Sequence, residues 1–162
     1  MEASQKIVRY IEDRDSWEQK IKEQSTVLVG GCFDIFHYGH LSFLKKVYEE
    51  GKMVIIALES DEFIRMRKLK EPFHTQVQRA TILSHLDLVD LVICLPHFTE
   101  NEEYYQLVRT IHPDIIACTK GDPNLMYKEE QAKEVRARVL IVDNCEGFSS
   151  STIQHYAALS GD

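Results

Sequence analysis

The sequence of 162 residues lacks the features that mark several large protein classes. Its four cysteines, Cys32, Cys94, Cys118 and Cys145, stand far apart and form no C-x-x-C pair. We therefore interpret them as buried free thiols and not as ligands of a structural zinc site. Apolar runs are short: the run at 53–58, MVIIAL, is far below the roughly 20 residues that a membrane-spanning helix needs.

Two glycine-rich nucleotide motifs are also missing. Neither G-x-G-x-x-G nor G-x-x-x-x-G-K-[ST] occurs in the chain, which argues against a dinucleotide-dependent dehydrogenase and against a P-loop protein. Positive charge is in deficit, with 19 Lys and Arg residues against 26 Asp and Glu and a net charge of −7. An acidic surface disfavours nucleic acid and anionic membranes as partners. The N-terminus is charged and does not resemble a signal peptide, so we expect a cytoplasmic protein.

Short apolar runs alternate with longer amphipathic ones along the chain. The apolar runs, each a predicted strand, are 27–29, 53–58, 91–95, 115–118 and 139–142. Predicted helices cover 41–48, 75–86, 102–111 and 127–137, and a last one follows the serines at 149–151. Gly51 stops the first of these helices, and Thr75 with Gln78 forms a capping box at the start of the second.

This alternation predicts a single α/β domain, a doubly wound, Rossmann-like sheet of five parallel strands. We place the domain at 25–162 and expect residues 1–24 to be a helical N-terminal extension. Sheets of this kind bind ligands at the carboxyl ends of their strands, where the strand order reverses. The residues that follow each strand are therefore the candidates for a functional site.

The segment after the first predicted strand has the composition of a phosphate-binding site. Gly30-Gly31 ends the strand, and His37 and His40 stand three positions apart at the start of a helix, with Gly39 between them. The free N–H groups and the positive dipole end of such a helix favour an anion, and imidazole N–H groups add donors. Two alternatives are that the histidines only cap the helix or pack against phenylalanines, and that they bind zinc.

The amino-acid sequence of this segment resembles a motif of a known protein family. GCFDIFHYGH is similar to the first motif of the cytidylyltransferase-like nucleotidyltransferases, G-x-F-D-x-x-H-x-G-H. A second family motif, a glycine and an apolar residue followed by Ser/Thr residues, is similar to GFSSSTI at 147–153. The resemblance implies transfer of a nucleoside monophosphate from a nucleoside triphosphate, which carries Mg²⁺, to a phosphorylated small molecule. It also leaves a homodimer open, because family members are often dimers.

The resemblance implies roles for the residues at matching positions. The acceptor phosphate attacks the α-phosphorus in line, so positioning and charge stabilisation fall to the protein. His37 and His40 would bind the α- and β-phosphates, while a lysine would reach both reactants; Lys68 matches best and Lys70 second. The remaining implied nucleotide contacts are Cys32, Phe33, Gly39, Lys70, Lys120, Gly121, Asp122, Gly147, Phe148, Ser149, Ser150 and Ser151. The implied acceptor contacts are Asp34, Lys68 and Arg79.

Plainer interpretations stand beside several of these roles. The three serines are also good helix caps, and Asp122 also suits a turn. Arg65 and Arg67, in the basic run before Lys68, are interpreted as a solvated loop face.

Two departures from the family pattern bear on the subclass. Asn144 and Asp87 stand where many cytidylyltransferases have arginines. The sequence looks most like the heptose-phosphate adenylyltransferases, which favours ATP and a sugar 1-phosphate. CTP with glycerol 3-phosphate or a phospho-alcohol is the alternative substrate pair. A nucleotide-binding module without catalysis and a structural or metal-binding protein are the alternative functions.

Overall fold

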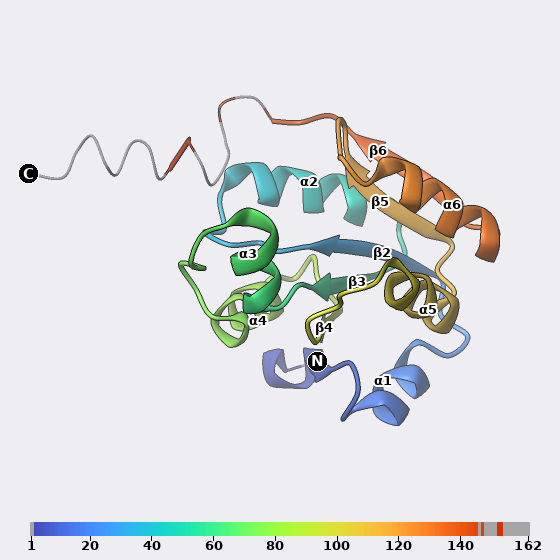
Figure 1. Cartoon of the computed structure of the whole chain (residues 1–162). Coiled ribbons are helices and arrows are strands. Elements are labelled where there is room, and N and C mark those ends of the chain that lie inside the picture. The colour runs from blue at the N-terminus through green and yellow to red at the C-terminus, as the bar shows by residue number, and fades with distance from the viewer. Residues whose placement is uncertain (1, 146, 148–151, 154–162) are drawn as a thin grey trace, which may run out of the picture.

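One six-stranded parallel sheet forms the centre of the computed structural model, which describes residues 2–145, 147, 152 and 153 (Figure 1). Every pairing between neighbouring strands is parallel. In sheet order the strands are β1 (Ile7–Arg9), β4 (Leu91–Cys94), β3 (Met53–Leu58), β2 (Thr26–Gly31), β5 (Ile115–Thr119) and β6 (Arg138–Val142). The predicted α/β class and parallel sheet are confirmed, and the described sheet has six strands where the sequence predicted five.

The additional strand lies in the segment that we expected to be wholly helical. β1 pairs with β4, with Val8 opposite Ile93, and so forms one edge of the sheet. The helix that follows places Trp17 under the sheet, where its ring stacks on Tyr10 and its indole N–H donates to the Tyr10 carbonyl oxygen at 3.1 Å. Residues before 25 therefore contribute to the sheet and to its core.

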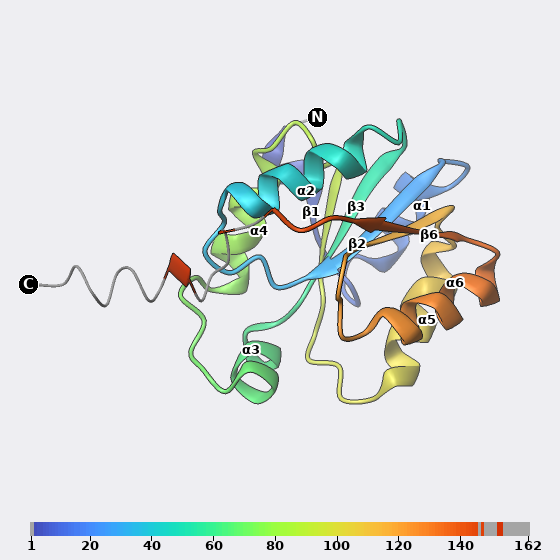
Figure 2. The same ribbon diagram turned by 90° about the horizontal axis from the view of Figure 1, so that it is seen from above.

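The helices cover both faces of the sheet (Figure 2). They are the short 3-10 helix η1 (Ala3–Lys6) and the α-helices α1 (Arg14–Ile21), α2 (Tyr38–Tyr48), α3 (Asp61–Lys68), α4 (Gln76–Ser84), α5 (Asn101–Ile111) and α6 (Leu125–Val135). The capping box predicted at α4 is present: Gln78 N–H donates to Thr75 Oγ1 at 3.3 Å, and Thr75 N–H donates to Gln78 Oε1 at 3.0 Å. None of the described helices is long and apolar enough to cross a bilayer.

Two apolar cores lie on opposite faces of the sheet, and β2 contributes to both. Leu28 packs with residues of α1, α5 and α6, whereas Val27 and Val29 pack with residues of α2 and α4. Because both faces are covered, the central strands are apolar without interruption. Most side chains on these strands are therefore buried, whichever face they point to.

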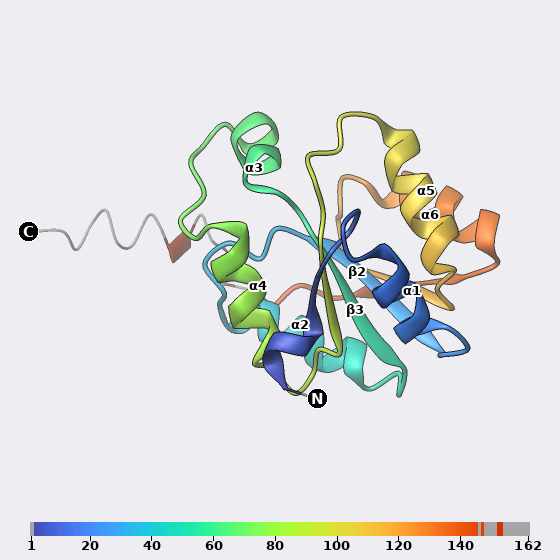
Figure 3. The same cartoon turned by 90° about the horizontal axis from the view of Figure 1, so that it is seen from below.

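The strand order reverses at β2. From β2 the chain proceeds through β3 to β4 on one side, and then crosses to β5 on the other side. The helices that follow β2 and β4 lie on opposite faces, so a crevice opens between the carboxyl ends of β2 and β5. Helix α3 lies beyond the carboxyl end of β3, on the same side of the molecule as this crevice (Figure 3).

Candidate active site

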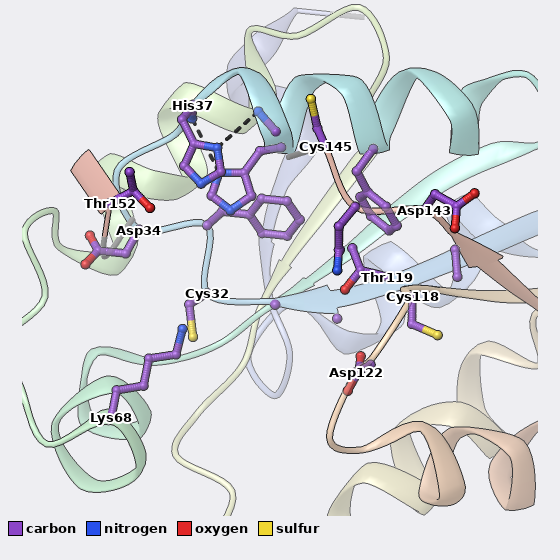
Figure 4. Close-up of a pocket in the computed structure, with 18 of the residues that line it drawn as sticks. Cys32, Asp34, His37, Lys68, Cys118, Thr119, Asp122, Asp143, Cys145 and Thr152 are labelled. Atoms are coloured by element: carbon purple, nitrogen blue, oxygen red, sulfur yellow. Dashed lines mark hydrogen bonds between the residues drawn. The ribbon is translucent and has the colours of Figure 1, made fainter. Parts of the chain in front are cut away.

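A cavity of about 840 Å³ occupies the crevice between the ends of β2 and β5. Gly30 and Gly31 of β2 and Ala117–Thr119 of β5 form its floor, and the start of α2 forms one wall (Figure 4). Most of the described residues that the sequence assigned to the nucleotide or the acceptor line it. They are Cys32, Phe33, Asp34, His37, Gly39, His40, Lys68, Lys70, Asp122 and Gly147.

The two histidines form the N-terminal cap of α2. His37 is the N-cap residue, and its Nδ1 accepts the backbone N–H of Gly39 at 3.1 Å. Nδ1 of His40 accepts the backbone N–H of His37 at 3.4 Å. The rings stack, with centroids 3.8 Å apart and planes inclined by 22°. Because both Nδ1 atoms accept hydrogen bonds, each neutral ring carries its proton on Nε2.

Both histidines are uncharged near neutral pH. Burial lowers the pKa of His37. For His40, burial and then the neighbouring His37 and Lys68 lower the pKa to about 4. The capping interpretation and the phosphate interpretation are therefore compatible, since Nδ1 holds the helix and the Nε2–H group is left for a ligand. In the described part of the chain, no group of three His, Cys, Asp or Glu side chains is placed to hold a metal ion.

The loop between β2 and α2 is conformationally strained. Phe33 and Ile35 have φ angles of 50° and 52°, in the left-handed region that β-branched residues such as isoleucine rarely enter. Each such residue costs on the order of 1–3 kcal/mol. A Cβ atom at Gly31 would lie 3.0 Å from the Phe33 ring, so a larger residue there would crowd the ring. Strain of this kind is concentrated at functional sites.

Asp34 anchors a neighbouring loop. Its carboxylate accepts the backbone N–H groups of Phe73 and His74 at 3.1 Å, and Lys70 Nζ lies 4.0 Å from Oδ2. Asp34 also lines the cavity. It therefore positions the segment that carries Lys70, and the predicted contact with the acceptor stays a prediction.

Arg79 lies beneath the cavity. Its side chain is fully buried in α4 and donates to the Cys32 carbonyl at 2.6 Å, to the His74 carbonyl at 3.1 Å and to Asp61 at 2.7 Å. Each of its three nitrogen atoms thus donates a hydrogen bond within the protein. We propose that Arg79 positions the segments around the cavity, and its predicted contact with the acceptor stays a prediction.

The basic run is helical at its start, where we had expected a loop. Helix α3 begins at Asp61, capped by Ser60, and ends at Lys68. Arg65 pairs with Glu62 and Glu71 on the exposed face, as its solvated interpretation predicted. Lys68 reaches the cavity beside Cys32 (Figure 4). Lys70 lines the cavity from the next segment.

The Lys120–Asp122 turn lies beside β5. Lys120 pairs with Asp143 on the surface, and its carbonyl oxygen accepts the side-chain N–H of Asn144 at 2.8 Å. Gly121 has a φ angle of 79°, which favours glycine. Asp122 lines the cavity and pairs with Lys128 at 2.6 Å. The predicted nucleotide contacts of Lys120 and Gly121 stay predictions.

The second family motif lies only partly within the described structure, and the cavity also has lining residues that the sequence did not predict. Phe148, Ser149, Ser150 and Ser151 lie outside the described residues, whereas Thr152 of the same motif lines the cavity. The sequence interpretation missed Lys128, which also lines the cavity. A signal for it existed, because Lys128 is in the first turns of the helix that follows a strand ending at the crevice. Cys118 and Cys145 lie there as well.

Comparison with known proteins decides the family. The model of the cytidylyltransferase-like family matches residues 28–155, which include both motifs and every residue that lines the cavity. The chain belongs to the cytidylyltransferase-like family. The prediction of a nucleotidyltransferase is confirmed at the level of this family.

Individual relatives support the assignment. The chain is 37% identical over 134 residues to the bifunctional protein HldE of Helicobacter hepaticus, a match that covers 82% of this chain and 26% of that protein. It therefore spans only about a quarter of the length of this relative. An FAD synthase of Thermococcus onnurineus is 35% identical over 117 residues, covering 72% of this chain and 74% of the synthase.

A solved structure has the same fold. The lipopolysaccharide core biosynthesis protein of Thermoplasma volcanium superposes with a TM-score of 0.61 at 25% identity. The superposition covers 75% of this chain and 97% of the other.

Proposed function

We propose that the protein transfers the adenylyl group of ATP to a phosphorylated small molecule, a sugar 1-phosphate, and releases pyrophosphate. The arrangement of His37 and His40 carries this proposal. Each ring uses Nδ1 to cap α2 and keeps Nε2–H as a donor at a helix N-terminus, beside a cavity that Lys68 and Lys70 also line. Uncharged donors and a helix dipole suit a polyphosphate, and the lysines suit the phosphate of a second anionic reactant.

In this reaction the protein has two tasks: it positions the two reactants and stabilises the charge that develops on the phosphate oxygens. An oxygen of the acceptor phosphate, already anionic, attacks the α-phosphorus, and the bond from that phosphorus to the β-phosphate oxygen breaks. The electron pair leaves with pyrophosphate, so no general base is required. The Nε2–H donors and Lys68 stabilise the charge that develops on the phosphate oxygens.

Mg²⁺ enters this scheme on the nucleotide. The carboxylates that line the cavity are already engaged: Asp34 by backbone N–H groups, Asp122 by Lys128 and Asp143 by Lys120. Among the residues that the structure describes, no three His, Cys, Asp or Glu side chains are grouped so that they could hold a metal ion. We propose that the triphosphate oxygens hold the cation and that its charge offsets theirs.

The choice of ATP and of a sugar phosphate rests on the relatives. FAD, the product that names the synthase relative, contains an adenylyl group, and the sequence also resembles the heptose-phosphate adenylyltransferases. Asn144, where many cytidylyltransferases have an arginine, donates its amide to the Lys120 carbonyl. It therefore stabilises a turn and adds no cation for a phosphate.

A nucleotide panel followed by an acceptor panel tests the proposal. Thermal unfolding is measured with ATP, CTP, GTP and UTP, each with Mg²⁺; a ligand at 100 times its dissociation constant stabilises the fold by about 2.7 kcal/mol. Pyrophosphate release is then measured with hexose and heptose 1-phosphates, glycerol 3-phosphate and phosphoethanolamine. We expect ATP to give the largest shift and a sugar 1-phosphate the fastest release.

Each other outcome has a defined meaning. Preference for CTP with glycerol 3-phosphate or a phospho-alcohol would replace the adenylyl assignment by a cytidylyl one. Tight nucleotide binding without pyrophosphate release from any acceptor would indicate a binding module and refute the enzymatic proposal.

A further inference from the structure

Lys128 is a largely buried cation in the wall of the cavity, and the proposed reaction has so far given it no role. It lies on α6 and lines the cavity, and its side chain is 16% exposed. Its Nζ donates to Asp122 Oδ2 at 2.6 Å, whereas Asp122 Oδ1 accepts the backbone N–H of Asn124 at 2.8 Å. An ammonium has three N–H donors, and Asp122 is the only acceptor that this one contacts in the described part of the chain. Two donors are therefore left for a ligand of the cavity.

The start of α6 holds this ammonium in place. The backbone N–H of Leu125 donates to the Asp122 carbonyl oxygen at 3.1 Å, and that of Lys128 donates to the Asn124 carbonyl oxygen at 3.1 Å. Lys128 and Asp122 are thus joined through the first turns of the helix as well as through their side chains. Because a lysine side chain loses much conformational freedom when it is fixed, an ammonium that is already oriented binds a ligand at a lower entropic cost.

Lys128 and the two histidines approach the cavity from opposite faces of the sheet. Helix α2, which begins beside His37 and includes His40, packs against the core on one face, whereas α6 packs against the core on the other. In Figure 4, Asp122, the partner of Lys128, lies across the cavity from His37. The cavity therefore has neutral donors on the α2 side and a cation on the α6 side.

The geometry of the reaction decides which reactant meets the α6 side. In an in-line transfer the attacking and the leaving oxygen lie on opposite sides of the α-phosphorus. The proposed function places the β-phosphate, which leaves, with His37 and His40 at α2. The acceptor phosphate therefore approaches from the side away from α2, where Lys128 lies.

Lys68 and Lys128 reach the same region from two different helices. Burial raises the pKa of Glu59, at the end of β3, to about 7, and the positive charges of both lysines act in the opposite direction. Both ammonium groups therefore lie within electrostatic range of the same point behind the cavity lining. A phosphate monoester carries about 1.5 to 2 negative charges near neutral pH, which is more than one lysine offsets.

We propose that Lys128, oriented by Asp122, binds the phosphate of the acceptor together with Lys68 and holds it for in-line attack. This inference rests on the proposed function and deepens it, because it adds a binding residue for the second reactant. The two lysines hold the phosphate from the α3 and the α6 side, so that the attacking oxygen faces the α-phosphorus. ATP binds at α2 and does not need Lys128.

The steady-state kinetics of Lys128→Met test the inference. Methionine keeps an unbranched side chain on α6 and removes the ammonium. We expect KM for the sugar 1-phosphate to rise roughly 10- to 100-fold, the loss that one hydrogen bond between charged groups predicts, and KM for ATP to stay near the wild-type value. Lys128→Arg keeps the charge and should recover part of the loss. Lys133→Met, at an exposed lysine on the same helix, is the matched control and should change neither constant.

Inorganic phosphate tests the contact without the sugar. With ATP saturating, phosphate should inhibit the wild type in competition with the acceptor, because it occupies the same site. Lys128→Met should raise the inhibition constant of phosphate by about the factor by which it raises KM for the acceptor. An unchanged inhibition constant would show that Lys128 does not contact the phosphate, and it would overturn the inference.

The partner carboxylate needs a control of its own. Lys128→Met leaves Asp122 without its ion pair, and an uncompensated carboxylate would itself repel the acceptor. The double variant Lys128→Met, Asp122→Asn removes that charge, and its KM for the acceptor is expected to stay raised. A return to the wild-type KM in the double variant, or a parallel rise in KM for ATP in Lys128→Met, contradicts the inference. A thermal midpoint near that of the wild type shows that a variant is folded, and Lys128→Gln, whose amide still donates to Asp122, replaces a methionine variant that is not.

The same measurements separate two failures. If the wild type releases no pyrophosphate with any acceptor, the proposed function fails and this inference fails with it. If the wild type is active and Lys128→Met keeps the wild-type KM for the acceptor, nucleotidyl transfer stands and the role of Lys128 is wrong.

Discussion

At the scale of single residues, the two nitrogen atoms of each imidazole, in His37 and in His40, have different roles. Nδ1 of His37 and of His40 completes the cap of α2, which leaves only Nε2 for chemistry. An alanine at either position would remove both contributions at once, so lost activity would not reveal its cause. Substitutions that keep the cap and remove the Nε2–H donor are therefore the sharper tests.

His37→Asn and His40→Gln meet this requirement. Asparagine is a preferred N-cap residue, and glutamine is the usual partner three positions on in a capping box. Removing one preorganised donor lowers turnover by on the order of 10² to 10³. We expect that loss in kcat for ATP and the best sugar 1-phosphate, with the thermal midpoint almost unchanged. Turnover near wild type in both variants would refute the assigned role of the pair.

His40 also makes the stability of the fold depend on pH. In the unfolded chain a histidine binds a proton below about pH 6.5, whereas burial, His37 and Lys68 hold the pKa of folded His40 near 4 against the opposing charge of Asp34. The unfolded state therefore binds more protons between those values, and stability falls as the pH falls through that window. The fall in thermal midpoint from pH 7 to pH 5 should be smaller in His40→Gln than in the wild type. His85→Gln, at an exposed position, should retain the wild-type difference.

At the scale of elements, Arg79 joins three segments that bound the site. Its guanidinium binds the Cys32 carbonyl after β2, Asp61 at the start of α3 and the His74 carbonyl before α4. Removing one partner of a buried charge pair costs on the order of 3 kcal/mol. We expect Arg79→Met to lose about that much in urea unfolding, with a loss of nucleotide affinity. Arg67→Met on the exposed face of α3 should stay within about 0.5 kcal/mol of wild type.

The elements that the sequence predicted well are those with a strong local pattern. The Met53–Leu58 strand is a continuous apolar run, and α4 has a capping box, so both were found. β1 has only three residues, too few to show a period, and forms because β4 offers a free edge. α3 buries only Ile64, so its pattern does not stand out from a loop.

The residues of the candidate site also fall into those that the sequence could predict and those that only the fold reveals. Residues within one motif, such as His37 and His40, were predicted because their spacing along the chain sets their geometry. Lys128 comes from a separate segment and meets the site only through the sheet topology. Arg79 was assigned to the acceptor from its resemblance to the family, and only the fold shows that each of its nitrogen atoms donates a hydrogen bond within the protein.

At the scale of the whole molecule, the residues before 25 add an edge strand to the sheet and side chains to the core. Val8 and Tyr10 lie in the core with Trp17, and β1 covers the edge of β4. A chain that begins at Asp13 would expose that edge and part of the core, and open edges promote association. We expect a lower thermal midpoint and larger species in size-exclusion chromatography than for the full chain.

Nucleotide affinity provides the control for this truncation. The cavity lies at β2 and β5, away from β1 in the sheet, so ATP should bind the truncated chain at low temperature with near wild-type affinity. A truncated chain with an unchanged midpoint and a single monomeric peak would contradict the structural role given to β1.

The direction of β1 has a practical consequence for attached proteins. Because β1 runs parallel to β4, the turn of η1 that precedes Ile7 lies at the amino ends of the strands, where Lys6 donates to the Leu86 carbonyl (Figure 3). The crevice opens at the other pole of the sheet. A fluorescent or purification partner joined ahead of η1 would therefore project away from the crevice and leave the entry of substrates unobstructed.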